Sequence, residues 1–394
     1  MTDDVLEVAQ LDESPRAGEE LAQPVDLGSR MASWRTIASF AIALAILAVA
    51  LKKSGVTPGD LRTALTQVNP WLFGLAFVIY YTSFPLRTLR WRMLMRNANT
   101  GDELALLNRA RFRDLLEILY LSWFANCVVP AKLGDVYRAY LTRTSVGISA
   151  PRTVGTILAE RVLDLLVLFP LLLLAAVLTF RDQLFADSTM RTVVFGAMAL
   201  GIIAALAVLA IWQLGDGVRS RLPQRIHAIF TAFQEGAVRS FRRDLGALFG
   251  LTVLVWFCEG GRLYMVLWAL GLMGHGKIGP SAAWFLALGS SVITTLPAAP
   301  GGLGFVEAFL IASFKALKHG TTGGTAAAVA LLDRIISYLS LVVIGFIVYI
   351  CSSKTREALR APAPRNEPPA PGRPLQGEPS QVLGTLQSGA GSRR

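Results

Sequence analysis

Long apolar runs, separated by short charged stretches, make up most of this chain between Trp34 and Ile350. The run Thr192 to Gly215, "TVVFGAMALGIIAALAVLAIWQLG", contains no charged residue. It is long enough to cross the hydrocarbon core of a bilayer, which takes about 20 residues of helix. The pattern predicts six membrane-spanning helices, at Trp34–Leu51, Pro70–Trp91, Thr153–Phe180, Thr192–Leu214, Leu245–Leu272 and Thr325–Ile350.

Two other apolar segments, Leu115–Val129 and Ser281–Leu296, are too short and too interrupted to span. Each ends at a proline that is followed by a break containing glycine. This pattern is typical of re-entrant helices, which enter the membrane and turn back. The predicted fold class is therefore an all-α integral membrane protein, with about six spanning helices and two re-entrant helices.

The composition changes this picture little. The chain is 53% hydrophobic and 16% charged, which excludes an ordinary soluble domain. Its net charge of +11 does not indicate nucleic-acid binding, because the arginines stand beside apolar segments and no nucleic-acid motif accompanies them. The three cysteines and three histidines are far apart, so we expect no metal and no cofactor. We expect a disordered acidic tail at 1–33, a membrane domain at 34–351 and a disordered proline-rich tail at 352–394.

Basic residues predict the orientation. Two segments, Arg87–Arg113 and Gly215–Asp244, are rich in arginine, as cytoplasmic loops are. With six spans both termini then lie inside, so the first re-entrant segment enters from the cytoplasm and the second from outside. The segment Gly215–Asp244 has helical periodicity, which fits a helix on the membrane surface or a solvated linker helix. The arginines of Arg87–Arg96 fit a topology anchor that touches anionic lipid.

The two breaks belong to a predicted repeat. The stretches "VVPAKLGDVYRAYL" and "AAPGGLGFVEAFL" share Pro-x-x-Leu-Gly, and each is followed by a helix with an acid–arginine pair, Glu160–Arg161 or Asp333–Arg334. The repeat units run from about 70 to 180 and from about 245 to 350, the second inverted in the membrane. Inverted repeats with discontinuous helices are a recurring transporter plan, in which the substrate lies near the midplane.

The candidate substrate-binding residues are the charges and glycines of these segments. Ionised side chains are costly in hydrocarbon unless they are paired or hydrated. Two interpretations stay open: salt bridges that join helices, or a polar cavity for an anionic headgroup, with Arg161 and Arg334 as the cations. Asp135 and Arg138 fit a gate or, more simply, the headgroup level of the surface. The full set is Lys132, Gly134, Asp135, Arg138, Glu160, Arg161, Asp164, Glu259, Arg262, Gly301, Gly302, Gly304, Glu307, Asp333 and Arg334.

Four motifs in this order resemble the lysylphosphatidylglycerol synthase transmembrane-region family, also called the flippase-like domain family. They are "LRTLRWRMLMR", "NCVVPAKLGDVYRAYLTRTSVGISAPRTVGTILAERVLDLLVL", "PAAPGGLGFVEAFL" and "LLDRIISYLSLVVIG". The family includes the membrane half of the bacterial multiple peptide resistance factor, and the resemblance covers about Trp34 to Ile350. One departure is Asp333, where an aromatic residue often precedes the arginine; it puts in doubt whether the second half binds the same headgroup.

The resemblance implies a lipid-translocating module in a bacterial or archaeal cytoplasmic membrane. Its substrate would be an aminoacyl-phospholipid, a glycolipid or a prenyl-phosphate lipid. We expect no synthase activity, because the chain runs into a proline-rich tail after Ile350, so a separate enzyme would make the lipid. We expect this membrane lipid as a partner, together with a possible separate enzyme that makes it. We expect no nucleic-acid partner. A membrane enzyme, such as a glycosyltransferase or lipid synthase subunit, and a small-solute transporter are the alternatives.

Overall fold

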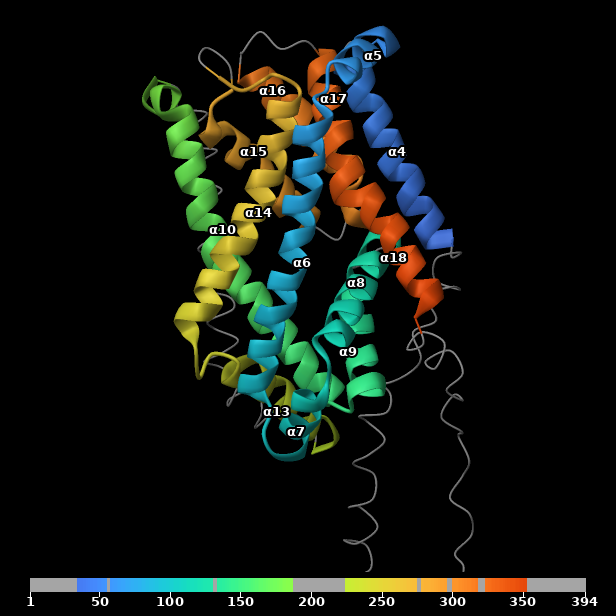
Figure 1. Cartoon of the computed structure of the whole chain (residues 1–394), viewed down its shortest axis with the longest axis vertical. Coiled ribbons are helices and arrows are strands. Elements are labelled where there is room, and N and C mark those ends of the chain that lie inside the picture. Colours follow the sequence, from blue (N-terminus) through green and yellow to red (C-terminus); the bar gives the residue numbers. More distant parts are fainter. Residues whose placement is uncertain are drawn as a thin grey trace, which may run out of the picture. The chain divides into compact units, whose positions relative to one another are not determined.

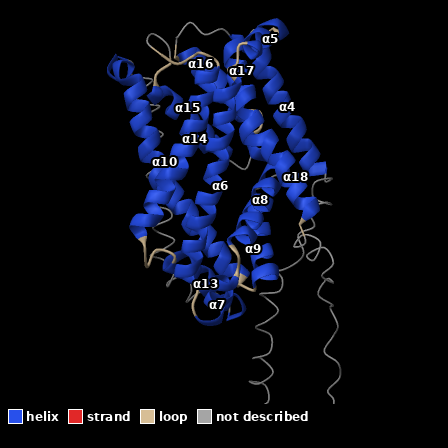
Figure 2. Ribbon diagram, viewed as in Figure 1, coloured by secondary structure: helices blue, strands red, loops and turns tan. Residues whose placement is uncertain are grey.

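Helices are the regular secondary structure of the computed structural model in the residues that it describes (Figure 2). These residues are 34–54, 57–129, 133–186, 224–274, 278–295, 300–317 and 323–352, and all belong to one compact unit. Both tails, the predicted span Thr192–Leu214 and the candidate residue Lys132 lie outside them. For the described residues, the prediction of an all-α membrane protein is confirmed.

The helices follow the predicted segments closely. The first part of the chain contains α4 (Trp34–Ser54), α5 (Pro58–Thr66), α6 (Pro70–Ala98), α7 (Gly101–Arg109), α8 (Phe112–Val128), α9 (Leu133–Val146) and α10 (Ala150–Ala186). The second part contains α13 (Gln224–Arg239), α14 (Leu245–Ala269), α15 (Pro280–Thr295), the 3₁₀ turn η2 (Pro300–Gly302), α16 (Phe305–Ala316), α17 (Gly323–Arg334), the π-helical turn η3 (Ile335–Leu339) and α18 (Ser340–Cys351).

Four helical stretches are long and apolar enough to cross a membrane: α6, most of α10, α14 and the continuous run Gly324–Cys351. In the most apolar 18 residues of each stretch, only 22–50% are buried, so much of the apolar surface of these helices faces outward. Val78 on α6 is 62% exposed and Ile347 on α18 is 54% exposed. A surface of this kind is stable against lipid and costly against water. The predicted span at Trp34–Leu51 lies within α4, whose apolar stretch Thr36–Ile46 is shorter.

Local chemistry explains where α6 begins. Asn69 is the N-cap residue, and its side-chain oxygen accepts hydrogen bonds from the backbone N–H groups of Trp71 (3.0 Å) and Leu72 (3.3 Å). Pro70 occupies the first helical position, where a missing N–H costs nothing. This cap sets the start of the helix that carries two arginines of the site described below.

The two predicted re-entrant segments are the first arms of two helical hairpins. Figure 1 shows α8 and α9 in the lower part of the molecule and α15 and α16 in the upper part. The hairpins approach each other near Cys127, whose carbonyl oxygen accepts a hydrogen bond from Tyr338 Oη (3.1 Å). A Cβ atom added to Gly301 would lie 3.9 Å from Cys127 Cα. This arrangement supports an inverted repeat, while re-entry into the membrane stays a prediction.

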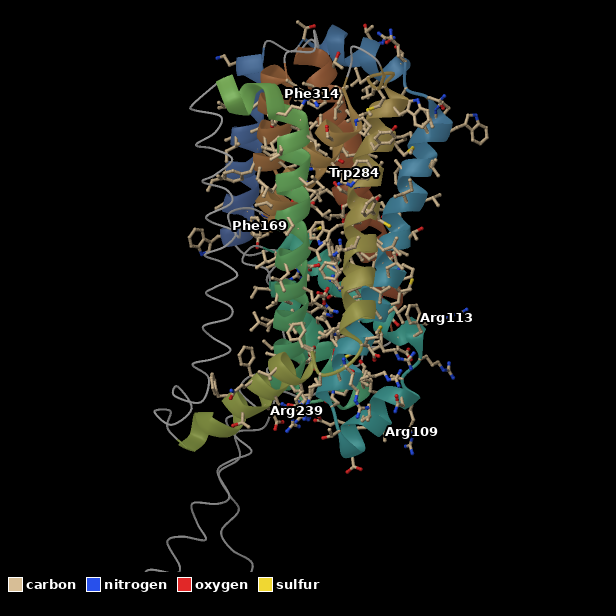
Figure 3. The ribbon with its side chains drawn as sticks, turned by 90° about the vertical axis from the view of Figure 1, so that its left-hand side faces the viewer. Arg109, Arg113, Phe169, Arg239, Trp284 and Phe314 are labelled. Atoms are coloured by element: carbon tan, nitrogen blue, oxygen red, sulfur yellow. The ribbon has the colours of Figure 1, made fainter. Side chains whose placement is uncertain are left out.

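Three arginines from the described parts of the two basic segments lie toward one end of the helices. Figure 3 shows Arg109, Arg113 and Arg239 at this end, whereas Phe169, Trp284 and Phe314 lie further along the helices. The helix α13 neither lies free as a linker nor rests on lipid alone, because it packs against the start of α10. Arg152 at the start of α10 pairs with Glu103 of α7 and with Glu235 of α13 (3.1 Å).

Close packing between α10 and α13 depends on two glycines. A Cβ atom added to Gly155 would collide with the backbone of Phe233, and one added to Gly236 would collide with the backbone of Arg152. We therefore expect Gly155→Ala to lower the thermal unfolding midpoint in detergent, since overpacking costs roughly 1–3 kcal/mol. Gly250→Ala on α14 is the matched control, because nothing lies within 4 Å of its added Cβ atom. Equal midpoints for the two variants would refute the tight α10–α13 contact.

Candidate functional site

Six arginines of the membrane helices are paired with carboxylates, and all of them except Arg161 are buried. Counting the described residues, they form three groups, each with as many carboxylates as arginines. The first-half cluster is Arg90, Arg138, Arg161, Asp135, Glu160 and Asp164. The central cluster is Arg87, Arg262, Glu259 and Asp333, and the second-half pair is Arg334 with Glu307. Each group is formally neutral, which lowers the cost of placing its charges in a membrane.

Arg90 is the centre of the first-half cluster. Its guanidinium is fully buried and donates to Asp164 Oδ1 (2.7 Å), to Glu160 Oε1 (2.9 Å) and to Thr252 Oγ1 of α14 (3.0 Å). Glu160 is shared, since its other oxygen accepts from Arg138 Nη1 (2.9 Å). The guanidinium of Arg138 also stacks over the Trp91 ring at 3.7 Å. The cluster thus joins α6, α9, α10 and α14.

Arg161 is held more loosely in the same cluster. Its Nη2 lies 3.4 Å from both carboxylate oxygens of Asp135, and its Nη1 lies 3.7 Å from Asp164. The Arg161 side chain is 33% exposed, the largest value among the six arginines of the three groups. Asp135 stands in the first turn of α9 and also accepts a long hydrogen bond from Asn126 (3.4 Å).

The central cluster connects α6, α14 and α17. Glu259 accepts from Arg87 Nη2 (2.9 Å) and from Arg262 Nη2 (3.4 Å). Arg262 pairs in turn with Asp333. The Arg87 guanidinium also lies 4.7 Å from the centre of the Trp123 ring, which supplies a favourable face for the cation.

The second-half pair lies at the other break. Arg334 donates from Nε to Glu307 Oε1 (2.8 Å) and from Nη2 to the Gly302 carbonyl (3.2 Å). Glu307 stands in the first turn of α16 and is only 4% exposed. The arginine therefore ties α17 to the turn before α16.

These contacts match between the two halves. In each acid–arginine pair the acid contacts an arginine of an earlier long helix: Glu160 contacts Arg90, and Asp333 contacts Arg262. In each, the arginine contacts an acid in the first turn after a break: Arg161 contacts Asp135, and Arg334 contacts Glu307. This agreement of contacts supports the repeat independently of the Leu-Gly motif.

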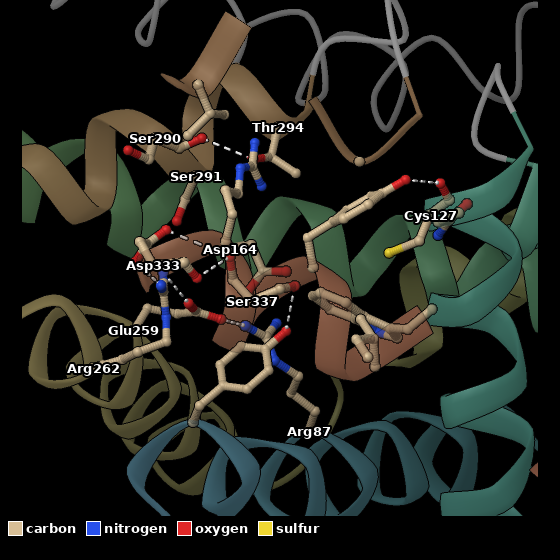
Figure 4. Close-up of a pocket in the computed structure, with 18 of the residues that line it drawn as sticks. Arg87, Cys127, Asp164, Glu259, Arg262, Ser290, Ser291, Thr294, Asp333 and Ser337 are labelled. Carbon is tan, nitrogen blue, oxygen red and sulfur yellow. Dashed lines mark hydrogen bonds and ion pairs between the residues drawn. The ribbon is translucent and has the colours of Figure 1, made fainter. Parts of the chain in front are cut away.

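A cavity of about 360 Å³ lies among the three groups (Figure 4). Four arginines and three carboxylates line it, so its lining has one cation in excess: Arg87, Arg161, Arg262, Arg334, Asp164, Glu259 and Asp333. Four serine and threonine hydroxyls also line it, and each donates its hydrogen to the carbonyl four residues earlier in the chain: Ser290, Ser291, Thr294 and Ser337. These hydroxyl oxygens therefore face a ligand mainly as acceptors.

Three sequence predictions about the charges were wrong. Arg138 is not at the surface, since it is fully buried. Arg87 and Arg90 are not topology anchors, because both are almost completely buried and paired with carboxylates. Asp333 and Arg334 do not pair with each other but with different helices. In each case tertiary contacts supply a partner that sequence spacing could not show. Two pairs of residues three apart on one helix do form ion pairs, Arg161–Asp164 and Glu259–Arg262.

The glycines divide into two kinds. Gly301 lines the cavity, and Gly301, Gly302 and Gly304 all have positive φ angles, which favour glycine. Gly134 instead serves packing, since an added Cβ atom would collide with the Ser122 carbonyl of α8 and with Asn126. Gly134 is not in the lining of the cavity, and its predicted part in substrate binding stays a prediction.

Arg90 and several cavity residues, among them Trp123, Asn126, Tyr80 and Tyr338, were not among the candidates predicted from the sequence. A signal for Arg90 existed: it stands 172 residues before Arg262, close to the 173 residues that separate Glu160 from Asp333. The aromatic residues had no such signal, because apolar helices contain many of them.

The chemistry open to this cavity is the binding of an anion with hydrogen-bonding groups. Arginine binds phosphate through two parallel hydrogen bonds and stays charged when buried. Within the described ranges no three His, Cys, Asp or Glu residues are grouped so that they could hold a metal ion.

Comparison with known proteins adds independent evidence. The family model described as the lysylphosphatidylglycerol synthase TM region matches residues 36–345. A UPF0104 membrane protein of Methanocaldococcus jannaschii is 35% identical over 227 residues, which cover 57% of this chain and 93% of that relative. A UPF0104 membrane protein of Methanothermobacter thermautotrophicus is 27% identical over 332 residues, covering 78% of this chain and 92% of the relative.

One relative has a more specific name. Glycosyltransferase AglD of Haloferax volcanii is 28% identical over 325 residues, which cover 74% of this chain but only 50% of that protein. Half of it therefore lies outside the similarity. No solved structure matches the chain.

Proposed function

Because the chain belongs to the lysylphosphatidylglycerol synthase transmembrane-region family, we propose that it moves an amphiphile with an anionic or phosphate-bearing headgroup between the leaflets of a membrane. The lipid is an aminoacyl-phospholipid, a glycolipid or a prenyl-phosphate lipid. Its headgroup crosses through the polar cavity, and its chains stay in the surrounding lipid. The chain itself is not an enzyme in this proposal, and a separate enzyme makes the lipid.

The single observation that carries the proposal is the cavity where the two hairpins approach each other. It holds one excess cation in its lining, while the helices around it are strongly apolar on their outer surface. A path for a headgroup needs this combination, because a charged group crosses hydrocarbon only where protein or water replaces its hydration.

The proposed location is the cytoplasmic membrane of a bacterium or archaeon, with both termini in the cytoplasm. The position of arginines from both arginine-rich segments toward one end of the helices supports a common side for these segments (Figure 3). Cytoplasmic loops carry such an excess of arginine and lysine.

The relative named as a glycosyltransferase supports a second candidate, a membrane subunit that presents a lipid-linked substrate to an enzyme. This chain matches only half of that relative. The cavity serves this role too, since a lipid-linked substrate also carries phosphate. Transport between leaflets separates the two functions, because a presenting subunit binds the lipid without moving it.

Native mass spectrometry of the full chain in mild detergent tests the proposed function. We expect a defined phospholipid or prenyl-phosphate species to copurify with the protein and to fall roughly tenfold or more in Arg161→Ala/Arg334→Ala, because hydrogen bonds to charged groups contribute about 1.5–3 kcal/mol each. The control is Arg96→Ala/Arg109→Ala, which removes the same charge from two exposed positions.

Arg161→Ala alone keeps the test valid if the double variant does not fold, because Arg161 is partly exposed. A nonspecific lipid profile that no variant changes would make these arginines structural and favour a small-solute transporter.

A further inference from the structure

The two halves hold their equivalent arginines with different strength. Arg161 and Arg334 each bridge to the acid in the first helical turn after a break, Asp135 or Glu307. The Arg161–Asp135 distance is 3.4 Å, with side chains 33% and 23% exposed. The Arg334–Glu307 distance is 2.8 Å, with side chains 11% and 6% exposed. A long, partly hydrated ion pair opens at lower cost than a short, buried one, because opening a buried pair leaves uncompensated charges away from water.

The neighbouring groups increase this difference between Arg334 and Arg161. Arg334 has a second anchor, since it also donates to the Gly302 carbonyl at 3.2 Å. Two other carboxylates lie near Arg161, Glu160 and Asp164. Asp164 lies 3.7 Å away, and both carboxylates already accept shorter hydrogen bonds from Arg90. Asp164 thus keeps its charge compensated when Arg161 moves.

Asp135 also accepts a second hydrogen bond, which does not come from Arg161. Asn126 donates to its carboxylate at 3.4 Å, while the Asn126 oxygen accepts from the Gly134 backbone N–H at 2.9 Å. Asp135 therefore keeps one donor when Arg161 leaves. Both Arg161 and Asn126 line the cavity, so a ligand reaches the side of this ion pair directly.

We propose that Asp135 is a built-in competitor of the headgroup: Arg161 exchanges the Asp135 carboxylate for the phosphate of the lipid, while the Arg334–Glu307 pair stays closed. This inference rests on the proposed function and adds to it which arginine binds and which hairpin responds. Loss of the Arg161 contact removes one of the two ion pairs between α9 and α10, and the buried Arg138–Glu160 pair remains. The start of α9 in the first hairpin is then the part that responds to substrate, and the second hairpin is the fixed part.

Binding of a soluble probe tests the exchange. The probe is dihexanoyl phosphatidic acid, with dihexanoylglycerol as its uncharged counterpart, titrated into the full chain in detergent. Asp135→Asn removes the competing charge and keeps the side-chain shape, so we expect the affinity for the phosphatidic acid to rise by up to about fivefold, the size of effect of one partly exposed ion pair. The affinity for dihexanoylglycerol should not change.

Glu307→Gln is the matched variant in the second half, and we expect no gain in affinity from it. Arg161→Ala/Asp135→Asn should lose the gain of Asp135→Asn. An unchanged affinity in Asp135→Asn, or a gain in Glu307→Gln, would overturn the assignment while leaving the proposed function intact. If the unaltered protein does not prefer phosphatidic acid to dihexanoylglycerol, the proposed headgroup class itself fails.

Discussion

Replacing Arg90 with alanine should unfold a large fraction of the protein. The substitution leaves Glu160 without one partner and Asp164 without its shortest hydrogen bond, and both carboxylates are at least 94% buried. Breaking a buried ion pair from one side costs about 3–5 kcal/mol. This is a large part of the roughly 5–15 kcal/mol by which folded proteins are stable. The measurement is the monodisperse fraction in size-exclusion chromatography, together with the thermal midpoint.

Two further variants serve as controls for this result. Arg96→Ala removes an exposed arginine of the same helix and should change the stability by no more than about 0.5 kcal/mol. Arg90→Met/Asp164→Asn removes one charge of each sign, so the cluster stays neutral, and it should recover part of the loss. A stable, monodisperse Arg90→Ala protein would contradict the structural role of the first-half cluster.

Gly301→Ala should lower the rate of lipid movement by at least tenfold if the proposed function holds. Gly301 has a φ angle of 57°, where an alanine costs roughly 1–2 kcal/mol. Its added Cβ atom would also lie 2.6 Å from the ring of Tyr338, and overpacking of this kind costs roughly 1–3 kcal/mol. The turn that carries Gly301 closes one side of the cavity, so its distortion acts on the headgroup path directly.

The assay follows fluorescent phosphatidylglycerol in proteoliposomes, with dithionite quenching of the outer leaflet. Gly271→Ala is the control, because Gly271 has a similar φ angle of 67° but nothing within 4 Å of its added Cβ atom. Gly301→Ala/Tyr338→Ala removes the colliding ring and should recover part of the rate. Indistinguishable rates for Gly301→Ala and Gly271→Ala would show that the contact with Tyr338 has no role in movement.

Much of the architecture was predictable from the sequence. Leu115–Val129 and Ser281–Leu296 correspond to α8 and α15 within a few residues, because apolar length and proline breaks are local properties. Of the two acid–arginine pairs, Glu160, Asp333 and Arg334 are buried, as charges in hydrocarbon are expected to be, while Arg161 is partly exposed. Their partners were not predictable, because the contact from Arg87 to Glu259 joins residues 172 positions apart.

The candidate site shows the same limit. Salt bridges that join helices are present, and four of the same arginines line the cavity, while the binding of a headgroup there stays a prediction. The looseness of the Arg161 contact depends on side-chain distances that no spacing rule encodes. Arg161, Arg262 and Arg334 were therefore predictable from the sequence as candidate cations, whereas the roles of Arg87 and Arg90 were not.

The separation of the charge partners along the chain also affects how the protein is made. Ribosomes add roughly 5–20 residues per second, so Glu259 emerges about 10–35 seconds after Arg87, 172 positions earlier. During this time α6 carries Arg87 without its later partner, and an uncompensated arginine at the middle of a membrane helix costs about 2.5–3.5 kcal/mol on insertion scales. The first helices thus have reason to remain at the insertion machinery, or near its water-filled side, until α14 arrives. Assembly of the two halves is then a single event late in synthesis. In neither half alone do the buried arginines and carboxylates balance, because Arg87 of the first half pairs with Glu259 of the second.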